Sequence, residues 1–387
     1  MQSGHLVIRD FAQISEASIA FRDLTVLVGA QGTGKSLVLQ WLKAAIDGKY
    51  IVQTLRDAGQ EVSRKTVIDL IFGVGMRSAW RDTSEVLFDG KEVSPATIER
   101  RGDRVEKLFF IPAHRSMLIS DGWATPFQKL TPETPVVARL FSQNLFERFN
   151  AREGAKLFPL DRLLKKVYRE LVNDAIFHGG TIGVEQNEQL TKRLRLRFEG
   201  AQETSLPFMT WTAGQREFTP LLLGLYHLLP PRNKKKDDNI DWVVIEEPEM
   251  GLHPQAVTAV MLLVLDLLWR GYRVVLSTHS PIVVTAVWAL QRLAARDAPY
   301  QLVCDAFSVP TYRRKGLRRV ASAALEKSFG TYLLQYKGSQ ATAIDISSLD
   351  PADEDDAVAG WGGLVGFSSR FAESVRDATN RISVEAA

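Results

Sequence analysis

The chain has 387 residues, a length that fits one large α/β body or two smaller domains. Hydrophobic residues make up 45% of it and charged residues 24%, a balance that excludes disordered and fibrous proteins. The formal net charge of +3 is too small to indicate nucleic-acid binding by itself.

The sequence favours a protein of a reducing compartment. Its first residues, MQSGHLVIRDF, do not place a charged region before an apolar one, so they predict no secretory signal. The longest apolar stretch, Ala256 to Trp269, contains Asp266 and is too short to cross a bilayer. The single cysteine, Cys304, excludes an internal disulfide framework and is expected to be a small buried hydrophobe. We therefore predict a cytoplasmic protein without a membrane segment.

The first elements of the chain lead into a phosphate-binding loop. Strand patterns are expected at Leu6 to Ile8, Ser18 to Phe21 and Leu24 to Val28. The third strand runs into GAQGTGKS, residues 29 to 36, which has the complete Gly-x-x-x-x-Gly-Lys-Ser form of the P-loop. A helical pattern follows directly, and this strand and helix are the surroundings that the loop requires.

Each residue type in this loop fits the binding of a nucleoside triphosphate. The glycines let the backbone turn tightly and approach phosphate oxygens, so that successive N–H groups form an anion-binding concavity. Lys35 is expected to reach the terminal phosphates and to support catalysis, and the Ser36 hydroxyl is expected to ligate Mg²⁺. The predicted nucleotide-binding residues of the loop are Gly29, Gln31, Gly32, Thr33, Gly34, Lys35 and Ser36.

The middle of the chain predicts a mostly helical insertion. A strand at Lys107 to Ile111 stops at Pro112, and polar residues follow it at the edge of a presumed parallel sheet. Apolar residues then recur at helical spacing from about Thr131 to His178, and Leu194 to Phe198 alternates as a half-exposed strand. The segment has no sustained heptad repeat, which argues against a long coiled-coil arm.

The last part of the chain alternates helices and strands, an order that implies a parallel sheet with crossover helices. Helices are expected at Gln215 to Leu229, Pro254 to Trp269 and Pro281 to Arg296, and strands at Trp242 to Ile245 and Arg273 to Ser277. A hairpin pattern, an acidic turn and a last helix follow at Thr331 to Ile346, Asp350 to Asp356 and Arg370 to Ile382.

Polar residues at the ends of two of these strands predict a hydrolytic site. Glu246 and Glu247 follow an apolar strand, where Glu246 would accept hydrogen bonds from metal-bound waters and Glu247 would polarise the attacking water. His279 follows the next strand, where its imidazole could contact the γ-phosphate. His253 is expected to cap the helix that follows it.

A second phosphate-binding end is predicted at the helix start Thr212-Ala213-Gly214-Gln215. Small residues there expose backbone N–H groups at a positive helix end, and Thr212 adds a hydroxyl donor. By itself this string is more typical of an ordinary helix N-cap, with Thr212 as the capping residue.

The order of these motifs resembles that of ATP-binding-cassette ATPases. Within that class the chain is similar to the soluble branch of SMC-like, RecF-like and overcoming-lysogenization-defect ATPases, ABC-type AAA ATPases of the kind found in bacterial defence systems. The resemblance matches residues 29 to 36 to Walker A, 212 to 215 to the signature motif, 246 to 247 to Walker B with its catalytic glutamate, 249 to 253 to the D-loop region, and His279 to the switch histidine.

The sequence differs from the family pattern at several positions. Ala213 replaces a signature glycine, and Glu246 stands where most P-loop proteins have aspartate. The lid glutamine of the family has no counterpart, although His114 and Arg115 occupy the comparable place after a strand. Arg9 and Phe11 are candidates for adenine contact, or are ordinary surface and core residues.

The resemblance implies an α/β P-loop fold of the ABC-ATPase type, with a mainly parallel central sheet, an antiparallel N-terminal β part and a helical insertion. The predicted boundaries are 1–112 for the first part of the ATPase domain, 113–206 for the insertion and 207–387 for the second part. It also implies an ATPase that binds ATP and Mg²⁺ and forms a homodimer, or a higher homo-oligomer, around two Mg·ATP molecules held head to tail.

Three roles for such a cycle follow from the resemblance. The first is control of a separate effector, such as a nuclease, in bacterial antiviral defence. The second is DNA repair or chromosome organisation with DNA as a partner, for which the basic run Arg313 to Arg319 is either a binding segment or a solvated face. A transporter subunit is the third, and the large insertion and the Pro-Glu-x-x-Leu-His-Pro form disfavour it.

Overall fold

The structure is a computed structural model. It describes residues 4–150, 156–160, 163–186, 191–200, 204–229, 235–364, 366, 371–376 and 378. The helix expected at 370–382 lies for the most part outside the described residues.

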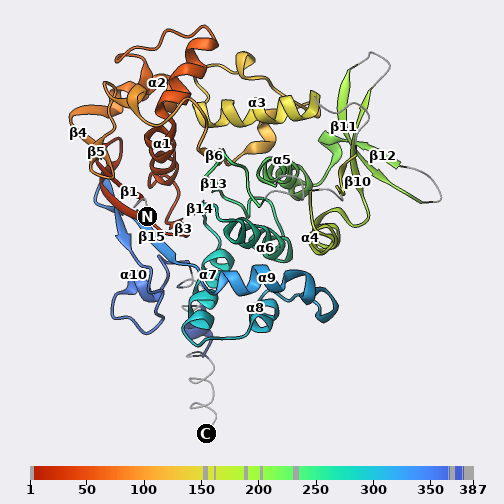
Figure 1. Cartoon of the computed structure of the whole chain (residues 1–387). Coiled ribbons are helices and arrows are strands. Elements are labelled where there is room, and N and C mark those ends of the chain that lie inside the picture. Colours follow the sequence, from red (N-terminus) through yellow and green to blue (C-terminus); the bar gives the residue numbers. More distant parts are fainter. Residues whose placement is uncertain are drawn as a thin grey trace.

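A ten-stranded sheet forms the centre of the molecule, in the order β5-β4-β1-β2-β16-β15-β3-β14-β13-β6 (Figure 1). Five neighbouring strands in it are parallel, and they are β15 (Phe329–Lys337), β3 (Leu24–Val28), β14 (Arg273–Ser277), β13 (Trp242–Glu246) and β6 (Leu108–Ile111). Because these strands run in one direction, the ends of β3, β14 and β13 meet at the same edge of the sheet.

The other half of the sheet is largely antiparallel. Its strands are β1 (Gly4–Phe11), β2 (Ile14–Phe21), β4 (Trp80–Phe88), β5 (Lys91–Glu92) and β16 (Gln340–Asp345). β15 and β16 form the expected hairpin, and β16 also pairs with β2 in parallel. The predicted mainly parallel sheet with an antiparallel N-terminal part is confirmed.

Alternate residues of the parallel strands enter two different hydrophobic cores. Val243, Ile245 and Leu276 pack with the helices on one face, which are α5 (Ala213–Leu228), α6 (Pro254–Arg270) and α7 (Pro281–Ala294). Val244 and Val275 point to the opposite face, where α1 (Lys35–Asp57) and α2 (Val67–Phe72) lie. Helices cover both faces, as Figure 1 shows, so these strands are nearly uniformly apolar.

Helix α1 is kinked at Asp47, whose backbone leaves the helical region at φ −120° and ψ 22°. The Asp47 carboxylate accepts hydrogen bonds from the backbone N–H groups of Lys107 and Leu108 at 2.9 and 3.0 Å, at the start of β6. Lys43 Nζ completes a buried network by donating to Asp47 Oδ2, Glu106 Oε1 and the Leu108 carbonyl, each at 2.6 Å. This network fixes α1 against the sheet.

The middle segment is less helical than predicted. It contains α3 (Val136–Asn150), α4 (Lys166–Val172) and a π-helical turn η5 (Asn173–Phe177). It also carries a second antiparallel sheet made of β9 (Lys156–Phe158), β10 (Thr181–Gln186), β11 (Lys192–Phe198) and β12 (Thr204–Pro207), together with the two-stranded pair β7 (Ile119–Ser120) and β8 (Trp123–Ala124). The second sheet projects beside α3 in Figure 1.

Among the described residues after α7 the structure has the helices α8 (Tyr300–Ala306), α9 (Arg314–Ala324) and the short α10 (Asp356–Ala359). Cys304 is buried in α8, as predicted. None of the described helices combines the length and the hydrophobicity that a membrane span requires.

Candidate nucleotide-binding site

The P-loop connects β3 to α1 in a conformation that only glycine adopts readily. Gly29, Gly32 and Gly34 have φ values of 138°, 77° and 94°. A Cβ on Gly29 would lie 2.0 Å from the Leu334 carbonyl oxygen, so the loop packs directly on β15. Lys35 Nζ donates to the carbonyls of Gly29 and Ala30 at 2.8 and 2.9 Å.

Two side chains that the sequence did not single out brace the tip of this loop. Gln13 Nε2 donates to the Gly32 carbonyl at 2.8 Å, and the Tyr336 hydroxyl donates to the same oxygen at 2.9 Å. Thr33 is buried and donates from its hydroxyl to the Ala30 carbonyl at 2.9 Å, whereas Gln31 is exposed. Contacts from residues so distant in the chain have no local sequence signal.

Glu246 ends β13 as a buried carboxylate, with only 5% of the residue exposed. Its Oε2 accepts a hydrogen bond from the Ala113 N–H at 3.1 Å, and its Oε1 has no hydrogen-bond partner. Burial raises the pKa of Glu246, although the nearby Ser36 hydroxyl and the Ala113 N–H oppose the rise. An orphaned buried oxygen beside a P-loop serine is a suitable place for a metal ion.

Glu247 and His279 face each other beyond the strand ends. His279 Nε2 lies 3.6 Å from Glu247 Oε1, and both side chains are about one-third exposed. Glu247 has a positive φ of 43°, a left-handed conformation that costs energy in a residue with a Cβ. Burial and the nearby Lys35 charge lower the pKa of His279, which favours a neutral imidazole at pH 7.

Lys35 lies at the centre of this group of acids. Burial lowers the pKa of Lys35, while the charges of Glu247, Glu249 and Glu246 oppose the shift. The structure therefore brings Lys35, Ser36, Glu246, Glu247 and His279 together from the ends of β3, β13 and β14. Their chemical roles remain predictions.

The predicted signature residues lie elsewhere, at the start of α5. Thr212 caps that helix with a capping box, in which the Gln215 N–H donates to its hydroxyl and its own N–H donates to Gln215 Oε1. Gln215 Nε2 also donates to the Ile176 carbonyl at 3.2 Å, and a Cβ on Gly214 would lie 3.0 Å from the Gly251 oxygen. Thr212 and Ala213 are exposed.

A comparison with protein families agrees with this site. The profile described as "AAA domain, putative AbiEii toxin, Type IV TA system" matches residues 24–285, a range that contains the P-loop, Glu246, Glu247 and His279. The chain belongs to this AAA domain family. Together with the sheet topology, this membership confirms the predicted P-loop ATPase fold of the ABC type.

Solved structures resemble this AAA domain protein at low identity. An SMC head bound to the C-winged helix domain of ScpA is 11% identical, with a TM-score of 0.44, and the match covers 89% of this chain and 97% of that one. The SMC head domain from Thermotoga maritima is 12% identical, with a TM-score of 0.37 and coverage of 89% and 99%. A dimeric bacterial ABC transporter cassette, MJ0796, is 12% identical, with a TM-score of 0.31 and coverage of 71% and 88%. No curated protein matches the chain in sequence.

The turn after β13 organises the AAA domain site. Glu249 Oε1 accepts from the Thr278 hydroxyl at 2.7 Å and from the His279 N–H at 2.8 Å, which fixes the end of β14 against the acidic strand. His253 caps α6 as predicted, because its Nδ1 accepts from the Gln255 N–H at 3.4 Å.

The structure also shows where the candidate residues for adenine contact and for the lid lie. Phe11 is fully buried and packs edge to face on Trp41, so it is unavailable to a base, and Arg9 pairs with Glu85. His114 is exposed, whereas Arg115 is fully buried beneath the acidic turn. For Phe11 the structure therefore favours the second alternative, an ordinary core residue.

The residues present fit a nucleotide-borne Mg²⁺. Ser36 and Glu246 provide two oxygen donors beside the phosphate loop, and Mg²⁺ on a triphosphate needs few protein ligands because phosphates and waters complete its shell. The described residues contain no group of three or more His, Cys, Asp or Glu side chains arranged to hold a metal.

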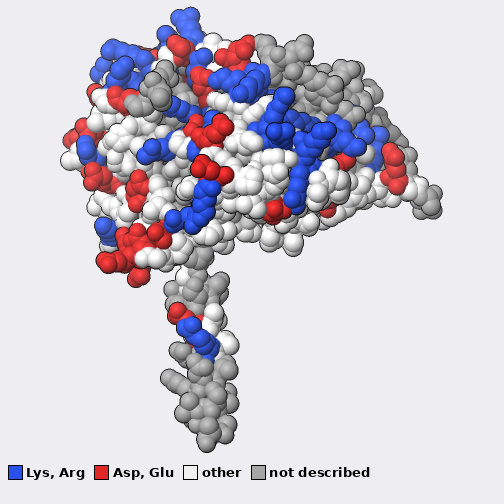
Figure 2. All heavy atoms as spheres, turned by 60° about the horizontal axis from the view of Figure 1, so that its bottom comes forward, with Lys and Arg blue, Asp and Glu red and all other residues white. Residues whose placement is uncertain are grey.

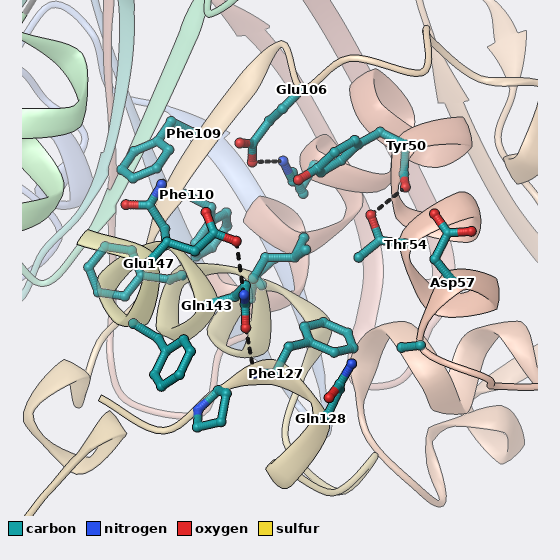
Figure 3. A pocket seen from close by; sticks show the side chains of 18 residues that line it. Tyr50, Thr54, Asp57, Glu106, Phe109, Phe110, Phe127, Gln128, Gln143 and Glu147 are labelled. Atoms are coloured by element: carbon teal, nitrogen blue, oxygen red, sulfur yellow. Dashed lines mark hydrogen bonds and ion pairs between the residues drawn. The ribbon is translucent and has the colours of Figure 1, made fainter. Parts of the chain in front are cut away.

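A pocket of about 370 Å³ lies away from this site, between α1, α3 and β6 (Figure 3). Its apolar wall includes Phe109, Phe110 and Phe127, and Glu106 and Tyr50 lie on the polar side. Burial raises the pKa of Tyr50 to about 12, so its hydroxyl stays protonated at neutral pH. Because the pocket lies by the start of β6, at the opposite edge from the P-loop, it is separate from the candidate nucleotide site.

Proposed function

We propose that this AAA domain protein binds Mg·ATP and hydrolyses it to ADP and phosphate. The observation that carries the proposal is the convergence of Lys35, Ser36, Glu246, Glu247 and His279 at one sheet edge. Lys35 donates to carbonyls of its own loop and is expected to transfer these hydrogen bonds to phosphate oxygens.

Glu246 and Ser36 would hold the Mg²⁺, which supplies neutralising charge to the phosphates when it is bound. Glu247 stays outside the strand with an accessible carboxylate, so it can orient a water molecule and accept its proton. His279, neutral and 3.6 Å from Glu247, can donate a hydrogen bond from one ring nitrogen toward a phosphate oxygen.

We further infer that the functional unit is a dimer whose two ATP molecules each lie between the P-loop of one chain and the α5 start of the other. The first turn of α5 supports this, because Thr212 and Ala213 are exposed there, and Gly214 packs so closely on the Gly251 turn that a Cβ would lie 3.0 Å from the Gly251 oxygen. Thr212, Ala213, Gly214 and Gln215 would therefore bind the γ-phosphate held by a second copy.

Complementation between two inactive variants tests this arrangement. Lys35→Ala removes the P-loop charge and leaves α5 intact. Ala213→Glu leaves the P-loop intact and repels a phosphate, while the helix dipole favours the new acidic residue in the first turn. Each variant alone should lack ATPase activity, and their mixture should regain part of it because mixed dimers contain one intact composite site. A mixture that stays inactive, although each variant still associates, would contradict the composite site.

Glu247→Gln tests hydrolysis separately from binding. This variant should retain ATP and accumulate as a dimer, because its site can no longer polarise water. Light scattering with ATP and Mg²⁺, compared with ADP, measures the change in mass. If the ATP-bound variant is strictly monomeric, the proposed dimer is contradicted. If the variant still hydrolyses ATP rapidly, Glu247 does not have its proposed catalytic role.

The cycle would control a separate effector, such as a nuclease, in bacterial antiviral defence. The family description names a toxin of a type IV TA system, which supports a function in a multicomponent bacterial system. A pull-down with Glu247→Gln tests the idea, since a partner that recognises the ATP state should copurify with this variant and be released by the ADP state. A cytoplasmic location is part of this proposal.

DNA organisation or repair is the alternative, and helix α9 is the observation that favours it. Lys315, Arg318 and Arg319 are exposed on α9, but Arg313 pairs with Glu170 and Asp174 and is not free for DNA. Figure 2 shows basic side chains interspersed with acidic ones on this side of the molecule. Stimulation of ATPase activity by duplex DNA that declines with salt would support this alternative.

A further inference from the structure

Arg115 is a fully buried cation directly beneath the acidic turn of the candidate site. It begins the short 3-10 helix η3 (Arg115–Leu118), just after β6. Its guanidinium donates to backbone carbonyls from three separate segments. The acceptors are Pro112 O at 3.1 Å, Glu246 O at 2.9 Å, Glu247 O at 3.2 Å and Glu217 O at 3.1 Å.

The charges of four nearby carboxylates, those of Glu217, Glu249, Glu247 and Glu246, partly offset the cost of burying Arg115, but its hydrogen bonds go elsewhere. In the described part of the chain, no hydrogen bond or ion pair joins Arg115 to a carboxylate, so carbonyl dipoles satisfy its donors. Burial lowers the pKa of Arg115 to about 10, which still leaves the guanidinium charged at neutral pH. A buried charge that depends on backbone carbonyls fixes those carbonyls in turn, because moving any of them leaves a donor unsatisfied.

Two of these carbonyls belong to Glu246 and Glu247. The positive φ of Glu247 is a conformation that the surrounding structure must hold in place. Arg115 binds the peptide on its carboxyl side, while the Glu247 N–H donates to the Ser277 carbonyl at 2.9 Å on the other side. Together these bonds set the direction in which the Glu247 carboxylate leaves the backbone toward His279.

The remaining acceptor belongs to α5. Glu217 lies in its second turn, and its side chain also accepts a hydrogen bond from the Ser116 hydroxyl, next to Arg115. A Cβ on Gly251 would lie 3.3 Å from Glu217 Cγ, so the turn after β13 packs on the same side chain. A shift of α5 would therefore act on Arg115 and on the acidic turn together.

We propose that Arg115 is a positioning residue that couples α5 to Glu247. When a second chain's phosphate binds the α5 start, Arg115 would transmit the position of that helix to the water-orienting carboxylate of its own site. Each ATP site would then sense occupancy of the other. The inference rests on the proposed function and assigns a role to a residue that is expected to touch neither nucleotide nor water.

The test compares Arg115→Met and Arg115→Lys with Arg139→Met. Arg139 is also fully buried and donates to a backbone carbonyl, that of Leu70 at 2.5 Å, but it lies in α3 away from the acidic turn. Three quantities are measured, namely the affinity for a fluorescent ATP analogue, the steady-state ATP turnover, and the pKa of the His279 ring by NMR. A His279→Gln sample assigns the His279 signal.

Arg115→Met should lower turnover by about tenfold to a hundredfold while nucleotide affinity changes little, since a misplaced catalytic group costs rate and not binding. The His279 pKa should fall, because the Glu247 carboxylate that raises it would no longer face the ring. Arg115→Lys should show an intermediate loss, since one ammonium cannot reach carbonyls on three segments. Arg139→Met should lose stability without changing turnover per folded molecule or the His279 signal.

Wild-type turnover and an unchanged His279 pKa in Arg115→Met would overturn the proposal. So would losses in Arg115→Met that only match those in Arg139→Met. If Arg115→Met does not fold, Arg115→Lys carries the same test, and wild-type behaviour of that variant would refute the coupling. The NMR measurement needs no hydrolysis, so an inactive wild-type protein would count against the proposed function while the His279 signal still decides the role of Arg115.

Discussion

Replacement of Glu246 by Gln should make the nucleotide-free protein more stable and, at the same time, unable to respond to Mg·ATP. The residue is 5% exposed, its Oε2 accepts a hydrogen bond from the Ala113 N–H, and its Oε1 has no hydrogen-bond partner. The Ser36 hydroxyl and the Arg115 charge offset only part of the cost of burying its carboxylate. Glutamine keeps the shape and the acceptor and removes the buried charge. An unsatisfied buried polar group costs about 1–3 kcal/mol, and a charged one costs more. Since the Glu246 carboxylate is partly satisfied, we expect Glu246→Gln to recover about 1–2 kcal/mol. In a protein of this size that corresponds to a rise in Tm of roughly 1–3 °C.

The stability gained by Glu246→Gln should increase with pH. Burial raises the pKa of Glu246 in the native state above that in the unfolded chain. The native carboxyl is therefore neutral at low pH and carries its full cost once it is ionised. Wild-type stability should fall as pH rises from the unfolded pKa through the native one, and the advantage of Glu246→Gln should grow over that interval and vanish below it.

Urea unfolding at several pH values, with and without Mg·ATP, measures both effects. Ligand at about 100 times its Kd adds about 2.7 kcal/mol to a protein that binds it. The wild type should gain this stabilisation and overtake Glu246→Gln, whose gain from Mg·ATP should be far smaller. A Glu246→Gln protein that is less stable than the wild type without nucleotide, at every pH, would refute the reasoning.

Glu106→Gln is the matched control, because burial also raises the pKa of Glu106. Glu106 forms a direct ion pair with a buried cation, Lys43, at 2.6 Å, whereas the buried cation near Glu246, Arg115, donates to the backbone carbonyl of Glu246 and not to its carboxylate. Removing its charge leaves part of that cation uncompensated, so Glu106→Gln should destabilise the protein by about 1–3 kcal/mol. If Glu246→Gln stabilises the protein and Glu106→Gln destabilises it, then a directly paired cation decides whether a buried carboxylate lowers or raises stability.

Two further predictions concern stability alone. Gly29→Ala should destabilise the protein by about 3 kcal/mol or more, because the new Cβ would lie 2.0 Å from the Leu334 oxygen and Gly29 has a φ of 138°. Gly59→Ala is the control, since Gly59 has a φ of 77° and a Cβ there would meet open space, and it should cost only about 1–2 kcal/mol. Lys43→Met should cost about 3–5 kcal/mol, because it leaves the fully buried Asp47 carboxylate without its cation. Urea midpoints at constant m measure both, and equal losses for the two glycines, or a neutral Lys43→Met, would contradict them.

The parallel half of the fold was predictable because its strands are buried on both faces. β3 and β14 begin and end at the residues that the sequence predicts, and β13 is longer by Glu246 alone. Uninterrupted apolar runs bounded by polar residues leave little freedom of register. The P-loop, the acidic pair and His279 follow those strands, so parallel topology brings them to one edge.

The antiparallel elements of the middle segment were less predictable. β10 and β12 contain Gly, Glu and Pro, residues that are depleted in strands, and only β11 alternates strongly. These strands form through pairing with β11, a tertiary effect that single-segment patterns do not contain. For the same reason Gln13 and Tyr336, more than 300 residues apart and bound to one carbonyl, have no signal in the sequence.

Three features of the candidate site are not predicted by sequence patterns and also lower the stability of the protein without its ligand. Glu246 is an incompletely satisfied buried charge, Glu247 has a left-handed backbone, and Arg115 is a buried cation whose hydrogen bonds go to backbone carbonyls. None of these choices follows from local propensity, and each costs free energy in the isolated chain. Because they meet at one turn, a ligand that satisfies the Glu246 oxygen would stabilise the same turn that Arg115 connects to α5. Binding at this edge should therefore order α5 as well as the P-loop, and amide hydrogen exchange near Glu217 should slow when Mg·ATP is added, even in a protein that cannot hydrolyse it.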